Sequence, residues 1–535
     1  MDGSAPKAFD LPAAETQLCR LSTDYDEQEA IDISVAFDEA FIPSTIGENS
    51  DYHFPMRTVY AEWTDVNYQQ HTETLAEGNI PFRYEKARNP LYNKVKTNLK
   101  WSSAEEANTR VKLYIENLFI MMRNKVLLSG GRLSDTKVIW FYPASMTEFR
   151  LNAFRGVWEK LFAKYINANS ADKLLCLSES AAPYFFYKNR MGLTSNAVTI
   201  DVGGGTTDVL VIKDDVPVAM TSFRFASNAI FGDGYNWSPE TNGFVKKYKG
   251  DINDRLVGNS MHLKDTLNAF QEIMNCDNSS DIAAFFFSLA GNAAVVRNRI
   301  PLDFMGMLCN DPKMKYVFIV FYGSVIYHIA KLIKAKNLPI PQVVAFSGNG
   351  SKTLNVLSPN EQTISVFVTR IFRKVLGECP DIRVIKVDEP KLATSKGGIY
   401  YDNSLSYEAI ESLRFSLLGD DDTTSTEGKK YNEVNNDKAI EAVSKNVSKF
   451  IDELFHISDA NKFMVGSLGA DPSLFEQIPE LCKYNLVEFT RQGLKAKLNE
   501  LSDWGQDPSA PIEETMFFYP IVAMLNNLAR EISNK

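Results

Sequence analysis

The chain is poor in the residues that build metal sites and disulfide frameworks. Among its 535 residues are only six cysteines and five histidines. The cysteines are scattered and form no Cys-x-x-Cys pair; they are Cys19, Cys176, Cys276, Cys309, Cys379 and Cys482. This scatter argues against a zinc site and against a disulfide-stapled secreted domain, and the few histidines argue against a transition-metal enzyme.

The chain also lacks an uninterrupted apolar run of the ~20 residues that a membrane-spanning helix needs. Its two richest stretches, 316–329 and 282–296, are shorter, and His328 and Asn292 interrupt them. The first stretch predicts a buried core helix over Tyr316 to Leu332. No basic-then-apolar signal peptide opens the chain, so we expect a cytoplasmic protein with no membrane partner.

Clustered positive charge is missing as well, since the net charge is −10 and the pI is near 5.3. Binding to nucleic acid is driven by clustered Lys and Arg, so we expect no nucleic-acid partner. Hydrophobic residues make up 44% of the chain, which is ample for buried cores. The length predicts about two to four domains.

What the chain does have is an acidic, glycine-rich loop between two apolar segments. Residues 201–208 are Asp-Val-Gly-Gly-Gly-Thr-Thr-Asp, and the flanking segments 196–200 and 209–212 predict the strands of a hairpin. Glycines without Cβ atoms let backbone N–H groups converge on an anion, and Asp201 can hold a hydrated cation. The expected phosphate-binding residues are Gly203, Gly204, Gly205, Thr206 and Thr207. An ordinary hairpin turn needs fewer glycines and no flanking carboxylates, so the combination favours phosphates with Mg²⁺.

Segments that change from strand to turn to helix stand on both sides of this loop. Upstream, 137–144 is a short apolar strand ending in Pro-Ala, and a helical stretch follows over 146–165. The segment 173–186 is a strand that continues into a helix, with Glu179 at the junction.

Downstream, 342–352 is an apolar strand that ends in a glycine turn before a helix. The turn contains Gly348, Asn349 and Gly350. The segment 393–400 is rich in small residues and predicts a closely packed helix.

In this order the segments resemble motifs of the actin-like ATPase superfamily, which includes actin, the sugar kinases and the seventy-kilodalton heat-shock chaperones. The triple glycine followed by Thr-Thr-Asp is most similar to the ATPase domain of the chaperones. The resemblance extends from about residue 137 to 402 and implies an α/β fold of two ribonuclease-H-like lobes.

The resemblance also implies roles for individual residues. The loop at 201–207 would be the second phosphate loop, and Glu179 would face the γ-phosphate and the water shell of Mg²⁺. The alternative for Glu179 is a carboxylate that only complements the dipole of the following helix. Gly348 to Gly350 would form the adenosine loop, and 393–400 would be the second hinge helix.

The chain departs from the family where a first phosphate loop, Asp-x-Gly-x-Ser/Thr, is expected. The nearest match contains Asp32, but Ser34 stands where the family has glycine. A second candidate, 417–426, has its glycine before the acidic residues and is better explained as a solvated linker. The chain is then a degenerate nucleotide binder, a fragment, or a protein whose first loop has diverged.

The expected organisation has four parts. An acidic N-terminal segment spans 1–50, a first actin-like lobe 51–195 and a second actin-like lobe 196–403. Residues 404–535 form a linker and a helical C-terminal extension, because apolar residues recur there at helical spacing. This extension is the candidate surface for a protein partner.

The resemblance implies a protein that binds ATP and Mg²⁺ between two lobes and couples nucleotide state to lobe closure. Glu179 and Asp201 would be the catalytic residues of an ATPase, with Asp201 also holding the metal. Since no first loop is recognised, we expect weak or absent hydrolysis. The alternatives are a non-catalytic scaffold that keeps the fold and a small-molecule kinase, because sugar kinases share the fold.

Overall fold

The structure is a computed structural model that describes three strands near the N-terminus and most of the chain from residue 105 onward. The described ranges are 57–63, 73–78, 92–97 and 105–535, with gaps at 147, 192–195, 236–238, 275–278, 388–391, 402–406, 415–428, 504–508, 510 and 513. Asp32, Ser34 and the acidic stretch 419–426 therefore lie outside the described residues, as does the N-terminal segment 1–50.

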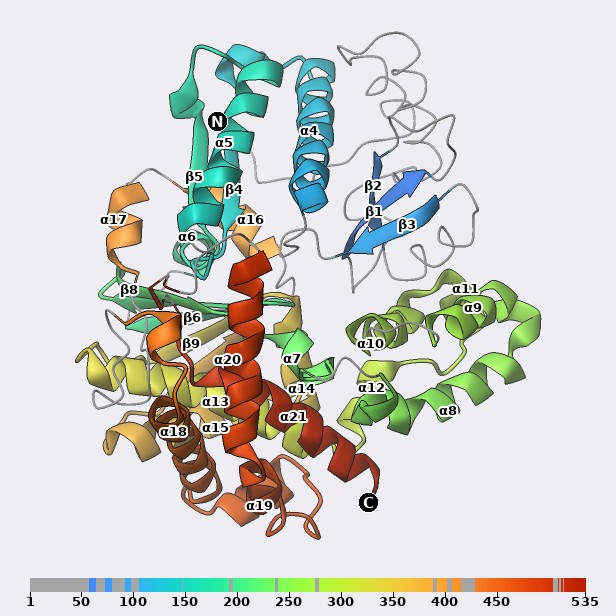
Figure 1. Cartoon of the computed structure of the whole chain (residues 1–535), viewed down its shortest axis with the longest axis vertical. Helices are drawn as coiled ribbons and strands as arrows, with labels where there is room; N and C mark the ends of the chain where they lie inside the picture. The colour runs from blue at the N-terminus through green and yellow to red at the C-terminus, as the bar shows by residue number, and fades with distance from the viewer. Residues whose placement is uncertain are drawn as a thin grey trace.

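A five-stranded mixed sheet forms the centre of the second lobe (Figure 1). Its order is β10-β9-β6-β7-β8, with β6 and β7 forming the predicted antiparallel hairpin and β9 and β10 running parallel to β6. The strands are β6 (Ala197–Val202), β7 (Thr207–Lys213), β8 (Val216–Phe223), β9 (Val343–Ser347) and β10 (Arg383–Lys386). The hairpin register places Asp201 opposite Asp208, so two carboxylates meet at the end that carries the glycine loop.

The first lobe contains a smaller parallel pair of strands. β4 (Val138–Tyr142) pairs with β5 (Leu174–Ser178), and α5 (Glu148–Tyr165) makes the crossover that a parallel pair requires. These are the strand, helix and strand that the sequence predicted. α4 (Glu105–Leu128) packs on α5. A separate antiparallel sheet has the order β2-β1-β3, with β1 (Arg57–Trp63), β2 (Glu73–Gly78) and β3 (Tyr92–Thr97).

The apolar stretch at 316–332 is a core helix, as predicted. It forms α13 (Lys315–Ala335), which is long and apolar enough to cross a membrane by length and composition alone. However, 94% of its most apolar window is buried inside the protein. It packs against α15 (Glu361–Leu376), while α14 (Leu354–Leu357) follows the glycine turn after β9.

Outer helices extend the second lobe between β8 and α13. They are α7 (Ser227–Phe231), α8 (Gly243–Gly258), α9 (Ser260–Ile273), α10 (Ser279–Ser288), α11 (Ala293–Arg297) and α12 (Phe304–Cys309). Phenylalanine rings join several of these helices, as where Phe231 of α7 meets Phe244 of α8 and Phe287 of α10.

Two helices with small residues cross where the lobes meet. α6 (Ala182–Met191) follows β5, and α16 (Leu392–Tyr400) forms where the sequence predicted a helix, whose role as a hinge stays a prediction. A Cβ on Gly397 would lie only 1.8 Å from the carbonyl oxygen of Ala182. The glycine therefore permits the close approach of the two helices.

The C-terminal helices share a hydrophobic core with the second lobe. They are α17 (Tyr407–Ser412), α18 (Asp437–Phe455), a π-helix (Lys462–Ser467), α19 (Ile478–Lys483), α20 (Leu486–Asp503) and α21 (Phe518–Ser533). Buried residues from β6 through α21 belong to one contiguous cluster. A Cβ on Gly243 of α8 would lie 2.2 Å from the carbonyl of Ala529 of α21, so these helices pack backbone to backbone. The boundary at 403/404 therefore does not separate two independent cores.

Candidate functional site

The glycine loop joins β6 to β7 and is held by a hydrogen bond within the loop and by hydrogen bonds from α7. The N–H of Gly203 donates to the carbonyl of Thr206 at 2.9 Å. The hydroxyl of Ser227 donates to the carbonyl of Gly203 at 2.9 Å, and the N–H of Asn228 donates to that of Gly204 at 2.8 Å. Because α7 holds both carbonyls, the N–H groups of Gly204 and Gly205 are the best candidates to face a ligand.

Gly204 has space above it that protein atoms do not fill. The residue is exposed, and a Cβ there would meet only the side-chain amide of Asn228, at 3.6 Å or more. None of the loop glycines has the positive φ that would demand glycine. Packing therefore does not explain why a side chain is absent at Gly204, whereas the approach of a ligand to the backbone would.

The two threonines of the loop face inward. Thr207 is fully buried and its hydroxyl donates to the carbonyl of Phe225 at 2.6 Å. The Thr207 hydroxyl therefore already donates within the protein, and its expected contact with a phosphate stays a prediction. Thr206 is also buried, at 7% exposed, and its carbonyl closes the loop.

Asp201 lies at the end of β6 beneath this loop. One of its carboxylate oxygens accepts hydrogen bonds from the hydroxyl of Ser347 at 3.0 Å and from that of Thr394 at 3.2 Å. Ser347 belongs to β9 and Thr394 to α16, so hydroxyls from two segments outside β6 position the carboxylate.

Asp208 stands opposite Asp201 and is 2% exposed. Burial, together with the nearby charges of Glu179 and Asp201, raises the pKa of Asp208 to about 7, while the hydrogen bond from Ser180 acts in the opposite direction. The Ser180 hydroxyl donates to this carboxyl group at 2.9 Å. Asp208 was not among the expected site residues, although the final Asp of the Thr-Thr-Asp motif could have indicated it.

Glu179 brings the first lobe to the site. It follows β5 directly, its N–H donates to the carbonyl of Tyr142 at 2.8 Å, and it is half-buried. Within the described part of the chain, no three His, Cys, Asp or Glu side chains are placed to hold a metal ion together. The acidic centre therefore does not form an all-protein metal cage. It suits a hydrated Mg²⁺, which usually keeps several waters and binds one or two carboxylates plus the substrate phosphates.

Gly348 and Gly350 are needed for a close backbone contact with the glycine loop and the end of β6. Gly348 has φ of 78°, and a Cβ on it would lie 2.3 Å from the carbonyl oxygen of Val202. A Cβ on Gly350 would lie 2.6 Å from the carbonyl oxygen of Gly203. The expected reason for these glycines was contact with a base and ribose; the structure gives a different one. Asn349, between them, is half-buried.

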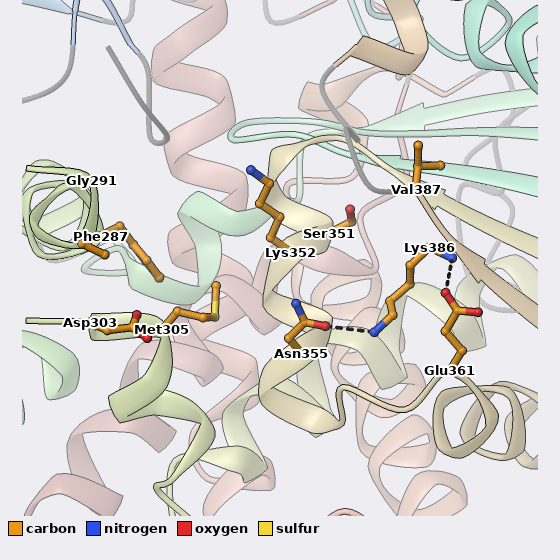
Figure 2. Close-up of a pocket in the computed structure, with 11 residues that line it drawn as sticks. Phe287, Gly291, Asp303, Met305, Ser351, Lys352, Asn355, Glu361, Lys386 and Val387 are labelled. Carbon is orange, nitrogen blue, oxygen red and sulfur yellow. Dashed lines mark hydrogen bonds between the residues drawn. The ribbon is translucent and has the colours of Figure 1, made fainter. Parts of the chain in front are cut away.

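The segment that begins at Gly348 also leads into a cavity of about 470 Å³ (Figure 2). One wall comes from the outer helices of the second lobe, and the other comes from the glycine turn, α14 and the end of β10. The lining residues are Phe287, Ala290, Gly291, Asp303, Met305, Ser351, Lys352, Asn355, Glu361, Lys386 and Val387. Since Ser351 directly follows Gly350, the cavity and the glycine loop are neighbours.

Two lysines give the cavity its positive groups. Burial lowers the pKa of both Lys352 and Lys386. For Lys386 the negative charge of Glu361 acts in the opposite direction, but its effect on the pKa is smaller than that of burial. The ammonium of Lys386 donates to the side chain of Asn355 at 2.9 Å (Figure 2). Ser351 and Lys352 belong to the segment 342–352 that the sequence singled out, whereas the residues of the opposite wall, Phe287 to Met305, are distant in the chain and carry no recognisable motif.

Comparisons with known proteins give structural likeness only. No protein-family model matches the chain, and no curated protein sequence matches it. Among solved structures, the chain is similar to the MamK double helical filament, with 12% identity over 68% of this chain and 95% of that one and a TM-score of 0.36.

The chain is also similar to MreB5 of Spiroplasma citri bound to ADP, with 13% identity over 66% of this chain and 89% of that one and a TM-score of 0.30. It is similar as well to the ethanolamine utilization protein EutJ from Carboxydothermus hydrogenoformans, with 12% identity over 70% of this chain and 98% of that one and a TM-score of 0.27. The expected mixed α/β fold with a helical C-terminal region is confirmed by the strands and helices of this chain itself. At such scores the likeness carries no argument about function.

Proposed function

We propose that this protein binds ATP together with Mg²⁺ beside the glycine loop at 203–206. The observation that carries the proposal is the unfilled space above Gly204, at the end of a hairpin where Asp201 and Asp208 meet. The adjoining cavity is of the size that ligand sites commonly have, roughly 300–1,000 Å³. A nucleotide can therefore place its base and ribose in the cavity and its phosphates over the loop.

The chain's own groups divide the work of binding. The N–H groups of Gly204 and Gly205 donate to phosphate oxygens, and Asp201 accepts hydrogen bonds from water around the metal. The hydroxyls of Ser347 and Thr394 hold one oxygen of that carboxylate in place. The aromatic and thioether groups of the cavity contact the base, while Lys352 and Asp303 supply its polar partners.

Hydrolysis is proposed to be slow. Mg²⁺, when bound, neutralises charge that develops on the phosphates, and the remaining catalysis is positioning. Glu179 orients the attacking water from the first lobe, so the attack requires the lobes to close on the nucleotide. The cytoplasm, where ATP and Mg²⁺ are abundant, is the compartment that this function implies.

Thermal unfolding with and without ATP·Mg²⁺ tests the binding proposal. A ligand that binds only the folded state raises the melting temperature. Gly204→Val should remove that rise without lowering the melting temperature of the free protein, because a Cβ there meets nothing closer than 3.6 Å. Gly250→Val is a matched control, since a Cβ on Gly250 has no heavy atom within 4 Å and the residue lies on α8, away from the loop.

An unchanged melting temperature of the wild type at millimolar ATP·Mg²⁺ would contradict nucleotide binding and leave the scaffold alternative.

Phosphate release measured for the wild type, Asp201→Ala and Glu179→Gln tests turnover. We expect a rate well below ~1 s⁻¹, the low end of typical enzymes, and a further loss in both variants.

A further inference from the structure

The C-terminal helix α21 lies directly behind the elements that hold the glycine loop. α7 fixes the carbonyls of Gly203 and Gly204, and α21 is in contact with α7 (Figure 1). The two helices are almost 300 positions apart in the sequence, so this support was not visible in the motifs.

Two hydrogen bonds and one close backbone approach join α21 to the turn that follows α7. The side chain of Asn526, which is 3% exposed, donates to the carbonyl of Gly232 at 3.1 Å. The hydroxyl of Tyr235 donates to the carbonyl of Tyr519 at 2.9 Å. Gly234 has φ of 63°, and a Cβ on it would lie 3.2 Å from the Cα of Ala523.

The far end of the glycine loop is backed by α21 as well. Thr207, which begins β7, donates its hydroxyl to the carbonyl of Phe225. The ring of Phe225 stacks on that of Phe518, the first residue of α21, with centroids 4.5 Å apart and planes 16° apart. Both ends of the loop are therefore held by segments that contact the same helix.

We infer that α21 is a positioning element for the phosphate-binding loop, with Asn526 as a positioning residue. The inference rests on the proposed function, because it concerns the affinity of the same site for phosphate groups. Seating of α21 and binding of phosphates are then thermodynamically coupled. Coupling of binding equilibria is reciprocal, so phosphates must also stabilise the seating of α21.

The first test compares two neighbouring buried asparagines of α21 in the full-length protein. Asn526→Ala removes the hydrogen bond to Gly232, whereas Asn527→Ala removes one that stays within α21, from Arg530 to the Asn527 side chain at 2.7 Å. Each loses one partly buried hydrogen bond, so both should lower the melting temperature by a similar amount. Dissociation constants for ATP·Mg²⁺ and for adenosine, measured by calorimetry, distinguish positioning of the glycine loop from a general contribution to stability.

We expect Asn526→Ala to weaken ATP·Mg²⁺ about fivefold, the equivalent of one net hydrogen bond, and to leave adenosine unchanged. Asn527→Ala should change neither. If Asn526→Ala leaves ATP affinity unchanged, or weakens ATP and adenosine equally, the inference is wrong while the proposed function stands. If the wild type binds adenosine but gains nothing from phosphates, the proposed function fails and the inference with it.

Hydrogen exchange on the wild type provides a second test that does not depend on a variant folding. Amides of 518–533 should exchange more slowly with ATP·Mg²⁺ than with adenosine at equal saturation. Equal protection by both ligands would overturn the coupling between α21 and the phosphates.

Discussion

Replacing His328 should stabilise the protein, and the gain should grow as the pH falls. His328 lies on α13, is 1% exposed, and packs against the rings of Phe223, Phe517 and Phe518. Neither ring nitrogen has a hydrogen-bond partner among the described groups. Burial disfavours the imidazolium and lowers the pKa of His328 from 6.5 to about 3.

The sign and size of the effect follow from proton binding. Between pH 6.5 and 3 the unfolded chain takes up a proton at this residue and the folded chain does not, so stability falls as the pH falls. Each pH unit below 6.5 costs about 1.4 kcal/mol. At pH 5 the wild type has lost about 2 kcal/mol, and near pH 3 the loss reaches about 5 kcal/mol.

His328→Phe removes both the proton uptake and the two unsatisfied nitrogens. At pH 8 we expect a gain of about 1–3 kcal/mol from the removed polar atoms, reduced by any strain from the larger ring. This strain does not depend on pH, so the advantage of the variant should still increase by about 2 kcal/mol between pH 8 and pH 5.

Urea unfolding of the wild type and His328→Phe at pH 8, 6.5 and 5 measures this difference. His262→Gln, which changes an exposed histidine on α9, is the control and should keep the wild-type dependence on pH. A difference between wild type and His328→Phe that stays constant from pH 8 to pH 5 would refute the reasoning, because it would mean that the buried ring titrates normally.

Three further changes test other parts of the structure. The pKa of Asp208 is raised to about 7, so the wild type loses stability as the pH rises from 4 to 7. Asp208→Asn should remove that loss, gaining up to about 4 kcal/mol in urea unfolding at pH 8 without divalent cations. Gly397→Val should lower the melting temperature markedly because of the Ala182 contact, whereas Gly466→Val, with no heavy atom within 4 Å, should not. Deleting 437–535 should expose the shared core and abolish cooperative unfolding, seen by calorimetry.

Local patterns predicted the elements that carry the glycine loop. The hairpin of β6 and β7, the strand β9 and the core helix α13 were all predicted from apolar runs bounded by glycine or polar residues. Such patterns predict elements because the burial of a strand or helix requires apolar residues at regular positions in one continuous segment of the sequence.

Contacts between distant segments were not predictable in the same way. The hydrogen bond from Asn526 to Gly232 joins residues almost 300 positions apart, and an asparagine in an amphipathic helix carries no sign of its partner. The inward orientation of Thr207 depends on the carbonyl of Phe225, which a hairpin pattern does not place. The helical spacing of the C-terminal region likewise predicted helices but not the core that they join.

For the glycines, the sequence alone does not distinguish those that packing requires from those that a ligand would require. In the sequence, Gly204, Gly348, Gly350 and Gly397 all belong to motifs that a phosphate, an adenosine or a hinge could explain. In the structure, a Cβ on any of the last three would meet backbone atoms at 1.8–2.8 Å, so packing alone requires glycine there. Gly204 differs, because only an exposed amide 3.6 Å away would meet its Cβ. Gly250 has similar space around it, but Gly204 lies between Asp201 and Asp208 at the end of the hairpin, and this makes Gly204→Val the substitution that tests the proposed site most directly.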